Sequence, residues 1–313
     1  MARLADLPPE LLLHILQFIP LPSLLRVSAL SHEWRRFFIE HESTIFRNAA
    51  IKHNFARPEV IHVDEARRAY AAKFLRDVQD WKTFCKQLYL LFQSWAGRGP
   101  VEIKALTECS FNVHRIKVDE EAGIVLTTHT TGGLRVTDLE TDKLLWALPE
   151  TYVRSWAHCE YQNGFLIFDR FGEYKEIWRL TMVDEESPPE PPPGRQDQVQ
   201  IQLGEGTARI ARIIRSRLYF RPWALLSTPE WGQAFRFVYP YLLVASLTKA
   251  YVYDVVSAIL VQTIEDTQNV NDPTNVQLGD INYVELNDKY VFICGSIELR
   301  IYSRSNGGCT IAP

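Results

Sequence analysis

A pattern of short alternating runs recurs along the last two thirds of the chain, and it constrains the fold more than any other feature. Apolar and polar residues alternate at 115–118 and 134–136, and short apolar runs lie between and after them at 124–126 and 144–146. Segments rich in Gly, Asp, Glu and Thr separate them. Four short strands joined by tight turns predict one antiparallel sheet.

Similar units follow this first one. Three runs recur in the second unit and in the last, and four in the third: 155–161, 165–169, 173–180; 235–239, 241–246, 250–254, 259–264; 281–286, 290–294, 298–302. The turn after the third run keeps its register, because 136–143 aligns with 252–259 and 301–308. A four-strand repeat of about 40–50 residues is typical of a β-propeller blade. A β-sandwich also has short strands, but without this recurring register. We therefore expect an all-β, propeller-like domain of about four blades over residues 101–313.

The last unit stops after its third run, so its fourth strand is missing from the pattern. This leaves three possibilities for how the ring is completed. Val101 to Leu106 could supply the missing outer strand. Gln198 to Thr228 could hide a further, degenerate blade. Otherwise the chain is a truncated product whose ring stays open, and an open ring leaves an unpaired strand edge that is prone to association.

Before residue 100 the apolar spacing is helical. Leu11, Ile15 and Ile19 recur every four residues on one face, which predicts an amphipathic helix. Prolines lie before and after it, and Ser23 and Ser31 are candidate N-caps of two further short helices. Three short helices within about 40 residues bury little surface alone, so this unit is expected to need a partner.

Two further segments join or interrupt these domains. A helical linker is expected over 49–100, with an apolar stripe from Ala66 to Trp95, and we expect it to pack one domain onto the next. Residues 184–198 are rich in proline and acidic residues, which predicts an extended, disordered insertion. Such a segment is either a ligand for an aromatic groove or a tolerated surface insertion.

Composition and motifs narrow the function classes. The net charge of −4 argues against nucleic acid and against an anionic membrane as partners. No apolar stretch reaches the roughly 18 residues of a membrane span, and no signal peptide is visible. Five scattered cysteines favour reduced thiols in the cytoplasm or nucleus. Neither a nucleophile elbow, nor a phosphate-binding loop, nor metal-ligand spacing occurs, so we expect no enzyme, no cofactor and no metal.

The first helices carry a family resemblance. The residues Leu7-Pro8-Pro9-Glu10-Leu11-Leu12, Ile15-Leu16, Leu24-Leu25, Val27-Ser28, Ser31 and Trp34-Arg35 resemble the F-box over residues 4–42. This resemblance implies a three-helix F-box domain at 1–48 and an α + β multidomain chain. An F-box followed by a helical linker and repeats is similar to the F-box/WD-repeat receptors of ubiquitin ligases. The repeats here lack the Trp-Asp dipeptide of that class, so the propeller is WD-like and degenerate.

The resemblance also implies partners and residues. An F-box docks on a Skp-type adaptor and, through it, on a cullin, and the propeller binds a client protein that the ligase ubiquitinates. About half of the F-box residues are expected to face the adaptor and the others the internal core, with Trp34 as the largest anchor. The expected adaptor-binding residues are Leu7, Pro8, Glu10, Leu11, Ile15, Leu16, Leu24, Leu25, Val27, Ser28 and Trp34.

A client site is predicted from a run of basic residues. Arginine forks suit phosphate and carboxylate, so a phosphorylated or acidic client could bind them. Arginines interleaved with Ile and Leu also occur on the solvated face of a helix or strand. An alternative function is an adaptor-bound scaffold that acts without ubiquitination. The run consists of Arg209, Arg212, Arg215, Arg217 and Arg221.

Overall fold

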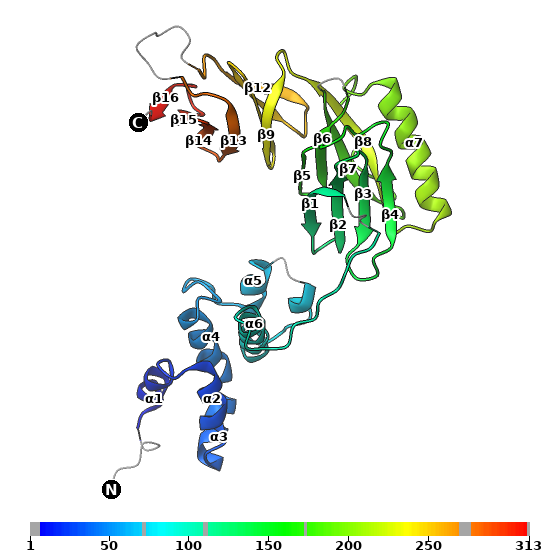
Figure 1. Ribbon diagram of the computed structural model, residues 1–313. Coiled ribbons are helices and arrows are strands. Elements are labelled where there is room, and N and C mark those ends of the chain that lie inside the picture. The colour runs from blue at the N-terminus through cyan, green and yellow to red at the C-terminus, as the bar shows by residue number, and fades with distance from the viewer. Residues whose placement is uncertain (1–6, 71–72, 109–111, 172–173, 269–276, 312–313) are drawn as a thin grey trace. The chain divides into compact units, whose positions relative to one another are not determined.

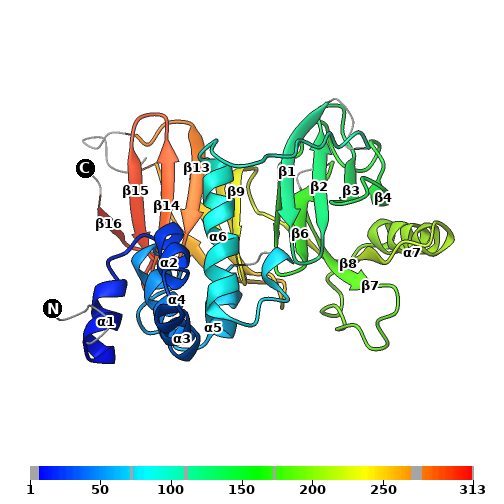
Figure 2. The same cartoon turned by 90° about the horizontal axis from the view of Figure 1, so that it is seen from below.

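The computed structural model describes residues 7–70, 73–108, 112–171, 174–268 and 277–311. By its contacts the chain divides into two compact units. A helical unit comprises residues 1–105 with 120–122, and a four-sheet unit comprises 106–119 with 123–313. Figures 1 and 2 show the helices and the sheets from two directions.

The helical unit begins with three short helices, as predicted. The bounds of its elements are α1 Pro9–Leu16, α2 Leu21–Ser28, α3 His32–Glu40, α4 Glu42–Lys52, α5 Val63–Arg68, η2 Lys73–Leu75 and α6 Trp81–Trp95. Ser31 caps α3, because its side chain accepts a hydrogen bond from the Trp34 N–H at 3.2 Å. The predicted cap at Ser23 is wrong. The helix α2 already starts at Leu21 with Pro20 as its N-cap, so Ser23 lies inside the first turn.

One hydrophobic core joins the first three helices to the helices that follow. Leu16 and Leu24 from α1 and α2 lie in the same buried cluster as Phe46, Phe84 and Leu88 from α4 and α6. The cluster is continuous, and α4 crosses residue 48 without a break. The three-helix unit therefore finds part of its missing core within its own chain.

Four antiparallel sheets of four strands form the second unit, which confirms the predicted propeller of four blades. Each sheet is built from strands that follow one another in the chain (Figure 1). Their bounds are β1 Val113–Asp119, β2 Ile124–His129, β3 Leu134–Asp138, β4 Leu144–Leu148; β5 Cys159–Gln162, β6 Phe165–Asp169, β7 Tyr174–Met182, β8 Leu218–Ser227; β9 Gly232–Val238, β10 Tyr241–Ser246, β11 Ala250–Asp254, β12 Ile259–Ile264; β13 Ile281–Leu286, β14 Tyr290–Gly295, β15 Leu299–Ser303 and β16 Cys309–Ile311.

The predicted register of the turn after the third strand is visible in its hydrogen bonds. Asp138 Oδ1 accepts from the Thr141 N–H at 2.8 Å, and Asp254 Oδ1 accepts from the Ser257 N–H at 2.7 Å. In the fourth sheet Ser303 Oγ accepts from Ser305 N–H at 3.2 Å. A short acceptor at the same place satisfies the turn amides in each case.

Two of the three possibilities for completing the ring are wrong. Residues 198–228 hide no further blade, because they form the helix α7, Gln198–Ile213, and then β8 as the fourth strand of the second sheet. The segment 101–107 forms no strand, and β16 completes the fourth sheet from the other end of the chain. The proline-rich segment before α7 has no helix or strand. Its end is tied to β8, where Leu225 N–H donates to Arg195 O at 2.7 Å.

Neighbouring sheets pack face to face. Trp146 of the first sheet lies 5.4 Å from Trp178 of the second, measured between ring centroids. One buried apolar cluster joins the second and third sheets, and another joins the third and fourth. Within the part of the chain that the structure describes, no comparable packing joins the fourth sheet to the first (Figures 1 and 2).

Candidate functional site

An apolar stripe runs along the outer face of α1. Leu11 and Ile15 lie four residues apart on one side of α1. Leu7 lies two residues before the helix begins, and Phe18 lies two residues after it ends. In chain order, the exposed fractions of these side chains are 36%, 50%, 38% and 65%. We call these four residues the α1 stripe. On the other side of the helix, Leu12 and Leu16 are buried.

A second exposed apolar area lies on α2 and α3. Leu24 faces the core and is 1% exposed, whereas its neighbour Leu25 is 44% exposed. Leu30, at the junction of the two helices, is 69% exposed. It lines a small surface hollow together with side chains from both helices: Ser28, Ala29, Ser31, His32 and Arg35.

The structure divides the predicted adaptor-binding residues into three groups. One group is exposed: Leu7, Pro8, Glu10, Leu11, Ile15 and Leu25. A second group is half-buried: Val27, Ser28 and Trp34. The third, Leu16 and Leu24, belongs to the internal core.

Trp34 lies against its own helix. Its ring centroid is 6.1 Å from that of Phe37 and 6.4 Å from that of Phe38, and it packs on the helical core. The side chain therefore contributes to folding as well as to the surface.

Sequence reasoning missed three exposed apolar residues of this region, Phe18, Leu30 and Ile39. A signal for Phe18 was its spacing of seven residues after Leu11, which is the repeat of one helical face, although the helix itself ends at Leu16. Nothing in the spacing distinguishes Leu30 or Ile39 from core positions.

The five predicted client-binding arginines do not form one patch. Arg209, Arg212 and Arg215 are exposed on α7 or just after it. Arg217 forms an ion pair with Asp138 at 3.0 Å, across to the first sheet. Arg221 on β8 lies 5.9 Å from the Trp223 ring.

The outer face of α7 combines the exposed arginines with apolar side chains. Ile210, Ile213 and Ile214 are 57%, 72% and 47% exposed and lie among Arg209 and Arg212. The opposite face is buried against the second sheet, where Gln200 Nε2 donates to Ala224 O at 3.2 Å. The helix therefore presents a basic and apolar surface on a firmly attached element.

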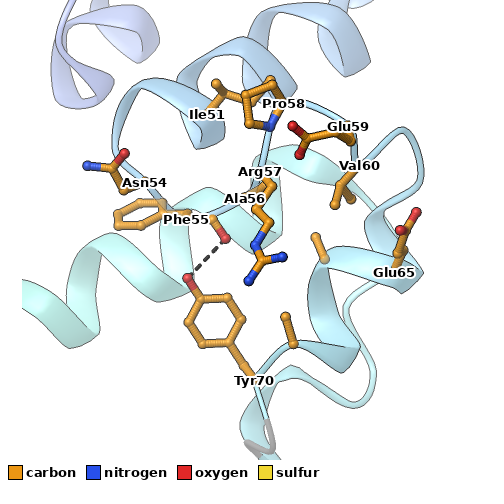
Figure 3. Close-up of a pocket in the computed structure, with 12 residues that line it drawn as sticks. Ile51, Asn54, Phe55, Ala56, Arg57, Pro58, Glu59, Val60, Glu65 and Tyr70 are labelled. Atoms are coloured by element: carbon orange, nitrogen blue, oxygen red, sulfur yellow. Dashed lines mark hydrogen bonds between the residues drawn. The ribbon is translucent and has the colours of Figure 1, made fainter. Parts of the chain in front are cut away.

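A second hollow lies in the helical unit, lined by residues between Ile51 and Tyr70 (Figure 3). The Tyr70 hydroxyl donates to Phe55 O at 2.9 Å along its wall, and the Arg57 side chain extends into it. None of the predicted site residues lines this hollow.

The four described cysteines differ in burial. Burial raises the pKa of the Cys85 and Cys159 thiols to about 12, so both stay protonated at neutral pH. Cys294 is half-buried and Cys309 exposed, and Cys109 lies outside the described residues. No group of three or more His, Cys, Asp or Glu side chains within the described ranges is placed to hold a metal. Nor does any helix in those ranges have the length and apolarity to cross a membrane.

Comparisons with known proteins bear on both units. Residues 4–45 match the F-box-like family. No curated protein matches the chain.

Among solved structures, the computationally designed Ika4 protein is 11% identical with a TM-score of 0.41, over 65% of this chain and 98% of that one. BamB from Moraxella catarrhalis is 11% identical with a TM-score of 0.40, over 64% and 52%. KlHsv2 with loop 6CD replaced by a Gly-Ser linker is 10% identical with a TM-score of 0.39, over 63% and 52%. The chain thus spans about half the length of the last two. By the match at its first helices and by its four sheets, the chain carries an F-box-like domain followed by four β-propeller blades.

Proposed function

We propose that the chain is the substrate-recognition subunit of a Skp–cullin–F-box ubiquitin ligase. The observation that carries the proposal is the α1 stripe, because it lies inside the segment that matches the F-box-like family and its apolar side chains are uncovered. The chain itself performs no chemistry in this role. It brings a client protein to a ubiquitin-charged enzyme.

The driving force for docking is burial of the exposed apolar side chains. Full burial of a Leu, Ile or Phe side chain contributes about 1.5–3 kcal/mol. The four residues of the α1 stripe, with Leu25 and Leu30, supply enough for a specific complex after the cost of association. The pre-formed helices lose little conformational freedom on binding, which keeps that cost low.

Co-purification with a Skp-type adaptor tests the docking surface. We expect Leu11→Asp with Ile15→Asp to abolish adaptor binding, because both positions are exposed in the free chain and would place two charges in a dry interface. The matched control is Ile61→Asp. That residue is 65% exposed in the same unit but outside the F-box-like segment, and its variant should bind as the wild type does. Retained binding by the double variant, with its helicity intact, would refute the docking model.

The ligase function itself needs a second readout. A cullin that co-purifies through the adaptor, and a ubiquitinated client that accumulates when the chain is depleted, are the expected results. Adaptor binding without a cullin would instead favour the scaffold that acts without ubiquitination.

For the client we propose the outer face of α7. Its arginines attract carboxylate or phosphate, and the neighbouring isoleucines provide apolar contact. A labelled acidic peptide, with and without phosphoserine, tests this. Arg209→Glu with Arg212→Glu should weaken binding at least about tenfold, and the wild-type affinity should fall with salt. Equal binding by the variant would exclude this face.

A further inference from the structure

The four sheets follow one another as a series, and among the described residues the first and the fourth each have a neighbouring sheet on one face only. In each sheet one face is turned toward the following sheet and the other toward the preceding one. We call the uncovered face of the first sheet the rear end face, and the uncovered face of the fourth sheet the front end face. In the internal junctions the corresponding faces are buried.

The rear end face exposes residues whose counterparts are buried. Ile116 stands three residues before the pair Asp119–Ile124 that closes the hairpin β1–β2. Cys159 and Phe235 stand three residues before the closing pairs Gln162–Phe165 and Val238–Tyr241. Val284 stands three residues before Asn287, whose N–H donates to Tyr290 O at 2.9 Å across the hairpin β13–β14. These three residues are 0%, 6% and 9% exposed. Ile116 is 58% exposed. Val118, two residues later, is 52% exposed.

The front end face is similarly uncovered. In the fourth sheet Tyr283 pairs with Cys294, which pairs with Leu299, so the three side chains share a face. Tyr283 is 76% and Leu299 46% exposed. On the opposite face of the same sheet, Ile293 and Tyr302 are buried against the third sheet.

One internal contact shows what would meet across these faces. His158 stands four residues before Gln162 in the second sheet, as Tyr283 stands four residues before Asn287 in the fourth. Phe235 holds the place of Ile116 in the third sheet. The rings of His158 and Phe235 lie 4.5 Å apart. Tyr283 and Ile116 would meet in the same way if a fourth sheet were followed by a first sheet.

A row of alternating charges along the innermost strands points to the same continuation. Lys117, Glu160 and Arg236 each stand two residues before the pair that closes their hairpin, on β1, β5 and β9. Glu285 on β13 stands two residues before Asn287, whose N–H closes the hairpin on Tyr290 O. Lys117 Nζ lies 2.7 Å from Glu160 Oε2. Arg236 lies 3.2 Å from Glu160 and 3.0 Å from Glu285. The row begins with a cation and ends with an anion, so a second row placed after it would again pair opposite charges.

We propose that the two end faces are covered by a second copy of this chain, which closes a two-fold ring of eight sheets. The front end face of each copy packs on the rear end face of the other, and Glu285 of one copy pairs with Lys117 of the second copy. Propellers have typically four to eight blades, so a ring of this size is an accepted closure. Closed two-fold symmetry forms both junctions at once and leaves no free sheet face.

The favoured occupant is a second copy because it brings both required surfaces and the matching charge. Any other protein would have to present an apolar sheet face and a correctly placed cation at one junction, and an anion at the other. The proposal is independent of adaptor docking, since the residues involved lie in the other unit.

The mass of the full chain in solution tests the proposal. Sedimentation or light scattering over a range of concentrations should give twice 36.2 kDa. Ile116→Lys and Tyr283→Asp should each raise the dimer dissociation constant at least about a hundredfold, because each places an unpaired charge in both junctions. Val261→Lys is the control. Val261 is 50% exposed on the outer strand β12, so that variant should remain dimeric.

Mixing the two variants distinguishes this ring from any other dimer. A mixed pair has one unaltered junction and one in which Lys faces Asp, so mixing Ile116→Lys with Tyr283→Asp should restore the dimer. A monomeric wild type would overturn the proposal and leave the faces to another protein or to solvent. Dimeric single variants, or a mixture that stays monomeric while each variant is folded by circular dichroism, would overturn it as well.

Discussion

The helical unit and the four-sheet unit both leave apolar surface uncovered, but for different reasons. In the helical unit, buried and exposed apolar residues are neighbours on the same short helix, as Leu24 and Leu25 are. In the four-sheet unit, the internal junctions are covered on both sides, and the exposed counterparts of their residues lie on the first and last sheets. On a helix, the residues that stay exposed are those on the face turned away from the core. In the series of sheets, they are those on the first and last sheets, which have a neighbour on one side only.

The internal junctions should be the most sensitive part of the chain. Trp178 is fully buried between the first and second sheets, and its indole N–H donates to Glu176 Oε2 at 2.8 Å. We expect Trp178→Ala to lower the free energy of unfolding of the four-sheet unit by about 3–5 kcal/mol. Trp231, which is 62% exposed, is the control, and Trp231→Ala should stay within about 0.5 kcal/mol of the wild type. If urea unfolding showed similar losses of stability for both variants, the internal junctions would not be more sensitive than the exposed surface.

Two adjacent leucines test the division within α2. Leu24→Ala should cost about 2–5 kcal/mol of stability, because it leaves a cavity in the helical core. Leu25→Ala should change stability by no more than about 0.5 kcal/mol and should weaken adaptor binding instead. Thermal unfolding and adaptor titration, run on both variants, separate the two effects. The reverse assignment would show that the outer face of α2 is part of the fold.

Two serines sharpen the comparison of sequence and structure. Ser31→Ala removes the cap of α3 and should cost about 1 kcal/mol. Ser23→Ala lies within the first turn of α2, where alanine has the higher helix propensity, and should be neutral or slightly stabilising. Denaturant unfolding of the two variants beside the wild type measures both changes in the free energy of unfolding. A larger loss at Ser23 would restore it as a capping residue.

The smallest expected effect is on how the stability of the four-sheet unit depends on pH. Burial acts to raise the pKa of Glu160, but hydrogen bonds from His158 and Lys117 outweigh it and hold that pKa below its ordinary value of 4.5. A depressed carboxyl pKa contributes stability above the unfolded-state value, and that contribution is lost as the pH falls through the folded-state value. Glu160→Gln should therefore show a shallower loss of stability than the wild type as the pH falls below about 5.

Glu176 provides the opposite sign for the same titration. Burial raises its pKa, despite hydrogen bonds from Tyr152 and Trp178. Its contribution therefore favours the folded state at low pH, and Glu176→Gln should steepen the acid loss. Identical slopes for the two variants would contradict both assignments.

Much of the fold could be predicted from periodicity. The period of two predicted strands from Arg115 onward, and the recurring units, three of which share the register of the turn after the third strand, predicted four sheets. The fourth strand of the second sheet was missed, because α7 and the proline-rich segment separate β7 from β8. Sequence distance hides such a pairing, since a strand finds its partner through space. The three-residue β16 was too short to produce a periodic signal.

The candidate docking surface was predicted only in part. The F-box resemblance selected the correct segment, but it named Leu16 and Leu24 beside Leu11 and Leu25 without separating core from surface. Adjacent leucines on one short helix look alike in sequence. Which of them is covered depends on where α4 and α6 pack.

The sequence by itself determined the local structure of this protein: helices before residue 100, short strands after it, and a four-strand unit that recurs. These follow from backbone preferences and from the side-chain periods of 3.6 and 2, which act over a few residues. Only the tertiary structure decided which apolar residues are left uncovered and that the fourth sheet does not meet the first. Burial depends on packing between segments that are distant in the chain, and a local sequence pattern does not specify which distant segments pack together.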